Sequence, residues 1–196
     1  MSDTTTPLIL PKAGTFEFEE KCSRFLSYCA PIQTEDDAWR VIAKTRVVHS
    51  KASHNVYVYS LSENNRIRFS DDGEPHGTAG MPILNVFQKT GVIDFICIVT
   101  RYFGGTLLGS GRLVRAYTKA AKGAMDAAAP TQRITTTTYR VTFPYSNHDT
   151  VKYNFGKWGI EILEELYTEQ CTLIVNVKEA HAQLFLQGMG YSIEII

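Results

Sequence analysis

The sequence predicts an α+β protein built from two domains, residues 1–130 and residues 131–196. Alternating, β-rich segments and segments of helical period follow one another along its 196 residues, as expected for mixed folds. Hydrophobic residues make up 44% of the chain, enough to bury one large core or two small ones. The order of elements after residue 131, β-α-β-β-α-β, is that of a ferredoxin-like domain.

The first domain opens with an antiparallel pair of strands, followed by a helix and a hairpin. The strands are residues 15–20 and 23–29, where polar and apolar residues alternate. Thr34 is placed as the N-cap of a helix over residues 34–49, whose acidic first turn suits the helix dipole. The hairpin strands are residues 54–61 and 66–70.

Two further helices of the first domain enclose a strand. Residues 81–91 have helical spacing, with Pro82 in the first turn and Gly91 as a stop. Residues 94–103 are nearly all apolar, which predicts a central strand covered on both faces. Residues 109–129 form the longest helix.

The second domain alternates strands and helices over the C-terminal third of the chain. The order is strand, helix, strand, strand, helix, strand, and the expected segments are 133–143, 149–159, 160–167, 171–178, 179–190 and 191–196.

Composition and motifs set limits on function. Lys plus Arg equals Asp plus Glu at 20 each, so no global charge attracts nucleic acid or membranes. No apolar run reaches the roughly 20 residues of a spanning helix, and the N-terminus has no secretion signal. The four cysteines and five histidines show no metal-ligand spacing. We therefore expect a cytoplasmic protein with no membrane association, no metal and no cofactor.

A local basic surface is predicted on the helix at residues 109–129. Arg112, Arg115, Lys119 and Lys122 are spaced three, four and three residues apart and so share one side. Arg101 adds a fifth positive charge, and Tyr102 beside it offers a ring for stacking an unpaired base, whereas Phe103 is expected in the core. These residues are candidates for nucleic-acid binding. An ordinary solvated helix face is the alternative, and the glycines of this segment match neither a P-loop nor a dinucleotide fingerprint.

The acidic loop after residue 70 has two interpretations. Asp71, Asp72 and Glu74 are able to bind a metal ion or handle protons. They also suit a turn, in which Asp71 and Gly73 take tight-turn positions. We favour the turn, with Thr78 capping the next helix and with Asp72 and Glu74 facing solvent and ion-pairing Arg101 or Arg112.

Two segments, "RFSDDGEPHGTAGMPILN" and "VTRYFGGTLLGSGRLVRAY", together with "KCSRFLSYCAPI", resemble the signature of the IMPACT family in its bacterial YigZ-like branch. The resemblance implies a first domain of the ribosomal-protein-S5-like α/β fold. The two folds in this order are similar to the last two domains of elongation factor G, which implies a role in translation. The signature residues in the two loops are Ser70, Asp71, Asp72, Gly73, Glu74, Gly77, Thr78, Gly80, Gly104, Gly105, Gly109 and Gly111.

The sequence therefore supports three hypotheses about function. The first is a non-enzymatic protein that binds RNA or the ribosome and regulates translation. The second is a hydrolase for a phosphorylated or nucleotide-like substrate that uses the acidic loop. The third is a module that docks a protein partner on the sheet of the second domain. His76 and Met81 depart from the family's usual Ser and Arg, which removes a positive charge beside the loop, and the oligomeric state is left open.

Overall fold

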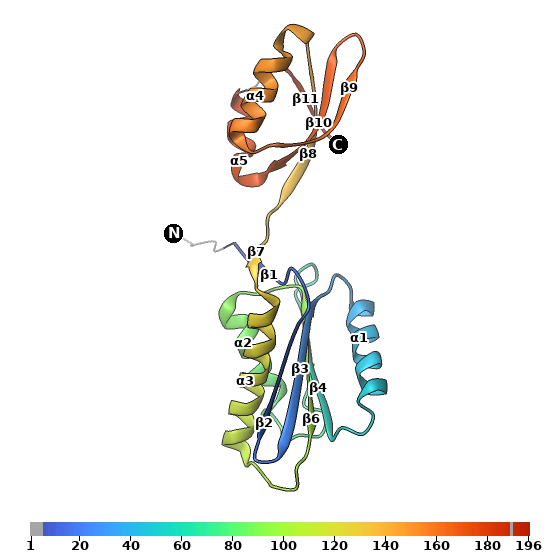
Figure 1. Cartoon of the computed structure of the whole chain (residues 1–196), viewed down its shortest axis with the longest axis vertical. Coiled ribbons are helices and arrows are strands. Elements are labelled where there is room, and N and C mark those ends of the chain that lie inside the picture. The colour runs from blue at the N-terminus through green and yellow to red at the C-terminus, as the bar shows by residue number, and fades with distance from the viewer. Residues whose placement is uncertain (1–5, 189) are drawn as a thin grey trace. The chain divides into compact units, whose positions relative to one another are not determined.

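The computed structural model describes residues 6–188 and 190–196, and the chain divides between Arg133 and Ile134 into two compact units (Figure 1). Each unit combines helices with an antiparallel sheet, which confirms the α+β class. No helix of the described residues is long and apolar enough to cross a membrane.

A five-stranded sheet with the order β2-β3-β6-β4-β5 forms the centre of the first unit. All neighbouring strands are antiparallel. Strand β6 lies in the middle, and every residue of it from Phe95 to Arg101 is buried, as predicted for a strand covered on both faces. The strands are β2 Gly14–Glu20, β3 Ser23–Pro31, β4 His54–Leu61, β5 Arg66–Ser70 and β6 Phe95–Tyr102.

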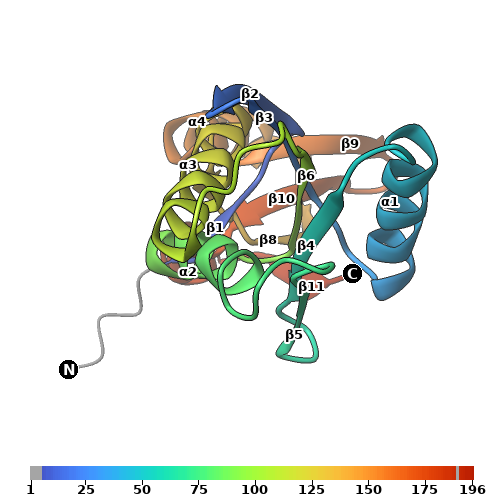
Figure 2. The same ribbon diagram turned by 90° about the horizontal axis from the view of Figure 1, so that it is seen from below.

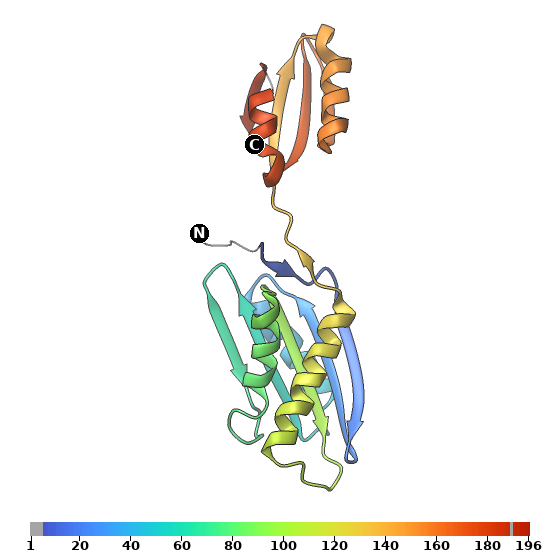
Figure 3. The same cartoon turned by 90° about the vertical axis from the view of Figure 1, so that its left-hand side faces the viewer.

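Helices cover the two faces of this sheet unequally. Helix α1 (Glu35–Val48) packs on one face, and helices α2 (Gly80–Thr90) and α3 (Ser110–Ala128) pack on the other (Figures 2 and 3). Thr34 caps α1 through a capping box with Asp37, as the sequence predicts. Gly91 ends α2 in the left-handed conformation.

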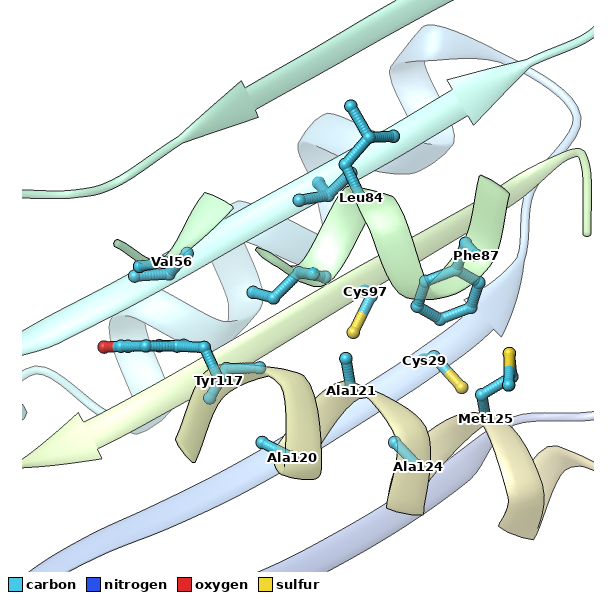
Figure 4. Packing of buried hydrophobic residues seen from close by; sticks show 14 of the residues in the cluster. Cys29, Val56, Leu84, Phe87, Cys97, Tyr117, Ala120, Ala121, Ala124 and Met125 are labelled. Atoms are coloured by element: carbon cyan, nitrogen blue, oxygen red, sulfur yellow. The ribbon is translucent and has the colours of Figure 1, made fainter. Parts of the chain in front are cut away.

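Small side chains let α3 approach the sheet closely. Ala120, Ala121 and Ala124 point toward the strands and are fully buried (Figure 4). Gly14 of β2 lies so near the helix that an added Cβ would come within 2.1 Å of the carbonyl oxygen of Ala124. Ser27 of β3 donates a hydrogen bond of 2.8 Å to the carbonyl oxygen of Ala120. The contact fixes α3, and therefore its outward face, against the sheet edge.

A two-stranded ribbon joins the two ends of the first unit. Strand β1 (Leu8–Ile9) pairs antiparallel with β7 (Thr131–Gln132), with Leu8 opposite Gln132. The sequence did not predict this ribbon, because two residues carry no readable period.

The second unit is ferredoxin-like. Its sheet has the order β11-β8-β10-β9, and all three pairs are antiparallel. Phe155 of α4 and Phe185 of α5 are buried against the strands. The elements are β8 Thr136–Phe143, η1 Tyr145–Asn147, α4 His148–Trp158, β9 Glu161–Tyr167, β10 Cys171–Lys178, α5 Glu179–Gly188 and β11 Ser192–Ile195.

Candidate functional site

Asp71, at the start of the acidic loop, caps helix α2. Its Oδ1 accepts a hydrogen bond of 2.8 Å from the backbone N–H of Gly80, and its Oδ2 accepts one of 2.9 Å from that of Gly77. The predicted cap, Thr78, is wrong, since its hydroxyl donates to the carbonyl oxygen of Pro75 at 2.6 Å. Asp71 therefore caps the N-terminus of α2, although it precedes the first helical residue, Gly80, by nine positions.

Asp72 ties the loop to the neighbouring strand. It adopts a positive φ of 45°, and its Oδ2 accepts a hydrogen bond of 2.6 Å from the backbone N–H of Asn55 in β4. Its Oδ1 lies 3.6 Å from a guanidinium nitrogen of Arg46 in α1. Asp72 is half-buried and pairs with neither of the two arginines predicted for it.

Glu74 is buried in an ion pair with Arg101. Its Oε1 accepts hydrogen bonds of 2.7 Å from Nη1 of Arg101 and of 2.7 Å from the hydroxyl of Tyr117 in α3. Arg101 also donates from Nη2 to the hydroxyl of Ser23 at 3.2 Å. The predicted pairing of Glu74 with Arg101 is therefore present, but the predicted exposure is wrong, because Glu74 is 7% and Arg101 4% exposed. Arg101 is an internal cation and not part of the basic surface.

This cluster changes the ionisation of Tyr117. Burial, followed by the neighbouring Glu74 carboxylate, raises the pKa of the Tyr117 hydroxyl above its ordinary value. Tyr117 consequently stays a hydrogen-bond donor to Glu74.

His54 completes the cluster, although no sequence motif singled it out. Its Nδ1 lies 2.8 Å from the carbonyl oxygen of Asp72. A carbonyl oxygen only accepts, so Nδ1 carries a proton and the lone pair of the neutral ring is on Nε2. That Nε2 lies 3.8 Å from Oε1 of Glu74.

A pocket of about 440 Å³ joins the acidic loop to the glycine-rich loop before α3. His54, Glu74 and Arg101 lie along it together with Phe103, Leu107 and Ser110. Phe103 was predicted to be in the core, yet it is 46% exposed. The reason is that β6 ends at Tyr102, so Phe103 lies in the loop that follows the sheet.

Two glycines shape the loop between β6 and α3. Gly104 passes so close to the turn between β2 and β3 that an added Cβ would lie 1.9 Å from the carbonyl oxygen of Cys22. Gly109, the N-cap residue of α3, has a φ of 76° that a larger residue adopts only with strain. Of the other signature residues, Gly73, Gly77 and Gly105 also have positive φ, Gly80 lies against Phe69, Gly111 faces open space, and Ser70 accepts a hydrogen bond from the N–H of Asp72.

The four predicted cations of α3 form an exposed stripe. Arg112, Arg115, Lys119 and Lys122 are all exposed, and none is ion-paired to an acidic residue in the described ranges. Nζ of Lys119 lies 4.3 Å from the ring centroid of Phe18 in β2.

Tyr102 does not join this stripe. Its hydroxyl lies 2.9 Å from Nδ1 of His49 at the C-terminal end of α1, which packs on the opposite face of the sheet (Figure 2).

A larger hollow, of about 630 Å³, lies between α1 and strands β2, β3 and β6. It contains neither signature loop, and its lining includes no cluster of charged side chains like that of Glu74, Arg101 and His54. We therefore place the candidate site at the smaller pocket and the adjoining stripe. Within residues 6–188 and 190–196, no three His, Cys, Asp or Glu side chains gather as metal ligands.

Comparison with known proteins gives concordant matches. The model of the Impact N-terminal domain matches residues 21–125. The chain is 32% identical to IMPACT family member YvyE of Bacillus subtilis, over 91% of this chain and 82% of that protein. It is 30% identical to IMPACT family member YigZ of Escherichia coli, over 90% and 89% respectively. A crystal structure of a hypothetical protein is similar with a TM-score of 0.62, 29% identity and 96% coverage of both chains.

Proposed function

This chain belongs to the IMPACT family, and from that premise we propose that it regulates translation by binding RNA, free or in the ribosome, through the outer face of α3. Binding of this kind requires no catalysis. The observation that carries the proposal is the stripe of four exposed cations, which have no ion-pair partner among the residues that the structure describes.

The geometry of the stripe suits a single phosphate backbone. Ten residues separate Arg112 from Lys122, so the stripe is roughly 15 Å long at the helical rise per residue. No acidic residue lies in the first turn of α3, and the free N–H groups there add to the attraction for phosphate. Cations in a row along one helix fit an extended strand better than a compact anion.

The link to translation rests on the order of the two folds. An S5-like unit followed by a ferredoxin-like unit is similar to the last two domains of elongation factor G, a factor that works on the ribosome. This similarity supports ribosomal RNA as one target and identifies no particular segment of it.

A salt series tests the proposal. We expect an unstructured RNA of about 12 nucleotides to bind at low salt, with log K falling against log salt at a slope of about −3 for four contacts to a single strand. Fluorescence anisotropy between 25 and 300 mM potassium chloride measures this slope. Co-sedimentation with purified ribosomes over the same salt range tests whether the protein also binds RNA within the ribosome.

Two single arginine-to-glutamine variants, one in the stripe and one outside it, provide the test and its control. Arg115→Gln removes one cation and is expected to lower the steepness of the slope by about 0.7. Arg140→Gln changes an exposed arginine of the second unit that is ion-paired with Glu194, and it is expected to leave the slope unchanged. Absence of RNA and ribosome binding at 25 mM salt, or equal effects of the two variants, contradicts the proposal.

A hydrolase is the second candidate, because one pocket joins the two loops as that hypothesis requires. Its weakness is that Asp71 and Asp72 are already hydrogen-bonded to backbone groups and Glu74 to Arg101. Release of phosphate from nucleotides by the wild type, abolished in Glu74→Gln, would rank this candidate first.

Docking of a protein on the second unit's sheet is favoured less. Such docking needs an apolar sheet face, whereas the residues of β10 that alternate with its buried ones are Thr172, Ile174, Asn176 and Lys178. Only one of these four side chains is apolar.

A further inference from the structure

Two residues that line the pocket beside the stripe, Arg101 and His54, have unused hydrogen-bonding capacity. The Nε of Arg101 is buried and has no hydrogen-bond partner in the described part of the chain. Nε2 of His54, 3.8 Å from Oε1 of Glu74, is too far away for a hydrogen bond. A buried, unpartnered arginine N–H is costly unless a ligand or water satisfies it.

The charges of the floor oppose a phosphate. Arg101 is neutralised by Glu74 at 2.7 Å, and any anion near the arginine would also meet that carboxylate. A neutral ligand with hydrogen-bonding groups avoids this repulsion. The floor of the pocket, formed by Glu74, Arg101 and His54, therefore suits a neutral group, whereas the stripe suits a phosphate. The two adjoin at the first turn of α3.

The walls of the pocket are apolar and include an aromatic ring. Phe103 is 46% and Leu107 85% exposed, and both lie along the pocket with Leu108 and Leu113. The guanidinium carbon of Arg101 lies 5.5 Å from the ring centroid of Phe103, so the cation backs a ring that is still open for stacking. Flat apolar surface above a polar floor suits a planar heterocycle.

We propose that this pocket binds one unpaired nucleobase carrying an exocyclic amino group, while the phosphates of the same RNA strand lie on the stripe of α3. The inference rests on the proposed RNA-binding function and names the part of the RNA that is recognised. Ser110 lies along the pocket and Arg112 belongs to the stripe, so a strand passes from one to the other within a single helical turn.

The floor predicts which bases are preferred. The pocket presents hydrogen-bond acceptors to a base: the Glu74 carboxylate, and Nε2 of the His54 ring in the tautomer whose proton is on Nδ1. Cytosine presents an amino donor where uracil presents a carbonyl acceptor. The two bases are otherwise of the same size, so comparing them isolates hydrogen bonding to the floor from stacking on Phe103.

The test compares labelled octamers of cytidine and uridine by anisotropy at fixed low salt. The wild type is expected to bind the cytidine octamer at least fivefold more tightly. Phe103→Leu is expected to weaken cytidine binding about tenfold, as for loss of one stacked base, with an unchanged salt slope because no charge is removed. Tyr153→Leu, which alters an aromatic residue 71% exposed in the second unit, is the matched control and is expected to bind as the wild type does.

The possible outcomes distinguish failure of the base pocket from failure of the proposed RNA binding. If the wild type binds neither octamer at 25 mM salt, RNA binding itself is wrong, and the base pocket with it. If both octamers bind equally, Phe103→Leu has no effect and Arg115→Gln still lowers the slope, the stripe binds RNA and the base pocket is overturned. A pocket that instead takes an apolar side chain of a protein partner gives this second result.

Discussion

The first unit carries two groups of charges that the chain uses in opposite ways. Glu74 and Arg101 lie inside, each less than a tenth exposed, and satisfy one another. The four cations of α3 lie outside, without ion-pair partners among the residues described. Charges that are buried and paired hold a loop in place, whereas charges left exposed and unpaired are available to another molecule. The two groups should therefore separate stability from binding.

The largest expected effect is that of Arg101→Met. Removing the arginine leaves the Glu74 carboxylate buried without its cation, and we expect the free energy of unfolding to fall by about 3–5 kcal/mol. A urea titration in a Trp158→Phe background reports this, because the fluorescence of Trp39 then follows the first unit alone.

The matched control replaces both partners. In Glu74→Leu/Arg101→Met no buried charge is left, so the double variant is expected to be more stable than Arg101→Met alone. If the loss of stability in the double variant equals the sum of the losses in Glu74→Leu and Arg101→Met, the two side chains do not act as a unit. The contrast between buried and exposed charges then fails.

Asp71→Ala is next in size. It removes the acceptor for the N–H groups of Gly80 and Gly77, and we expect a loss of about 1–2 kcal/mol, as for an N-cap. His76→Ala removes a fully exposed side chain of the same loop, whose Nδ1 lies 3.8 Å from Oδ2 of Asp71, and is expected to cost much less than Asp71→Ala in the same urea titration, because exposed pairs contribute little. Equal losses in both variants would mean that the loop responds to any substitution.

The stripe is expected to contribute little to stability. Arg112→Gln/Arg115→Gln/Lys122→Gln together should change the free energy of unfolding by less than about 0.5 kcal/mol per site, because these side chains have no described ion-pair partners. The same protein should lose most of its RNA affinity at moderate salt. A clear drop in the urea midpoint would show that these cations stabilise the fold.

The smallest expected effect is in acid. The side-chain hydrogen bond from Thr34, followed by those from the backbone N–H groups of Thr34 and Gln33, lowers the pKa of Asp37. Its stabilising contribution is therefore present above the unfolded pKa of about 4 and is lost as the pH falls through the lowered folded value. Asp37→Asn should be less stable than the wild type at pH 6, and the difference should shrink toward pH 2.5. A difference that is independent of pH would contradict this origin.

Much of the fold follows from periodicity. Alternation identifies β2 and β3, helical spacing identifies α3, and the buried run at 94–103 identifies the central strand β6, because each of these elements repeats its pattern over several residues. The β1–β7 ribbon was missed, since it is short and its pairing joins residues from the two ends of a unit.

The site was predictable only where the pattern is local. The stripe on α3 depends on spacing within one helix, and its exposure follows from that spacing. The pairing of Glu74 with Arg101, 27 residues apart in the chain, was predicted from the two signature loops, but no local pattern shows that the pair is buried. His54 was missed for the same reason, because its place beside Asp72 depends on how β4 pairs with the sheet.

The β1–β7 ribbon has a mechanical consequence. Leu8 is opposite Gln132, and the N–H of Arg133 donates to the carbonyl oxygen of Pro7 at 3.0 Å, so residues 7 and 133 leave the ribbon at the same end. A pulling force applied between residues 7 and 133 would therefore break the hydrogen bonds of the ribbon one after another, beginning with the bond between Arg133 and Pro7.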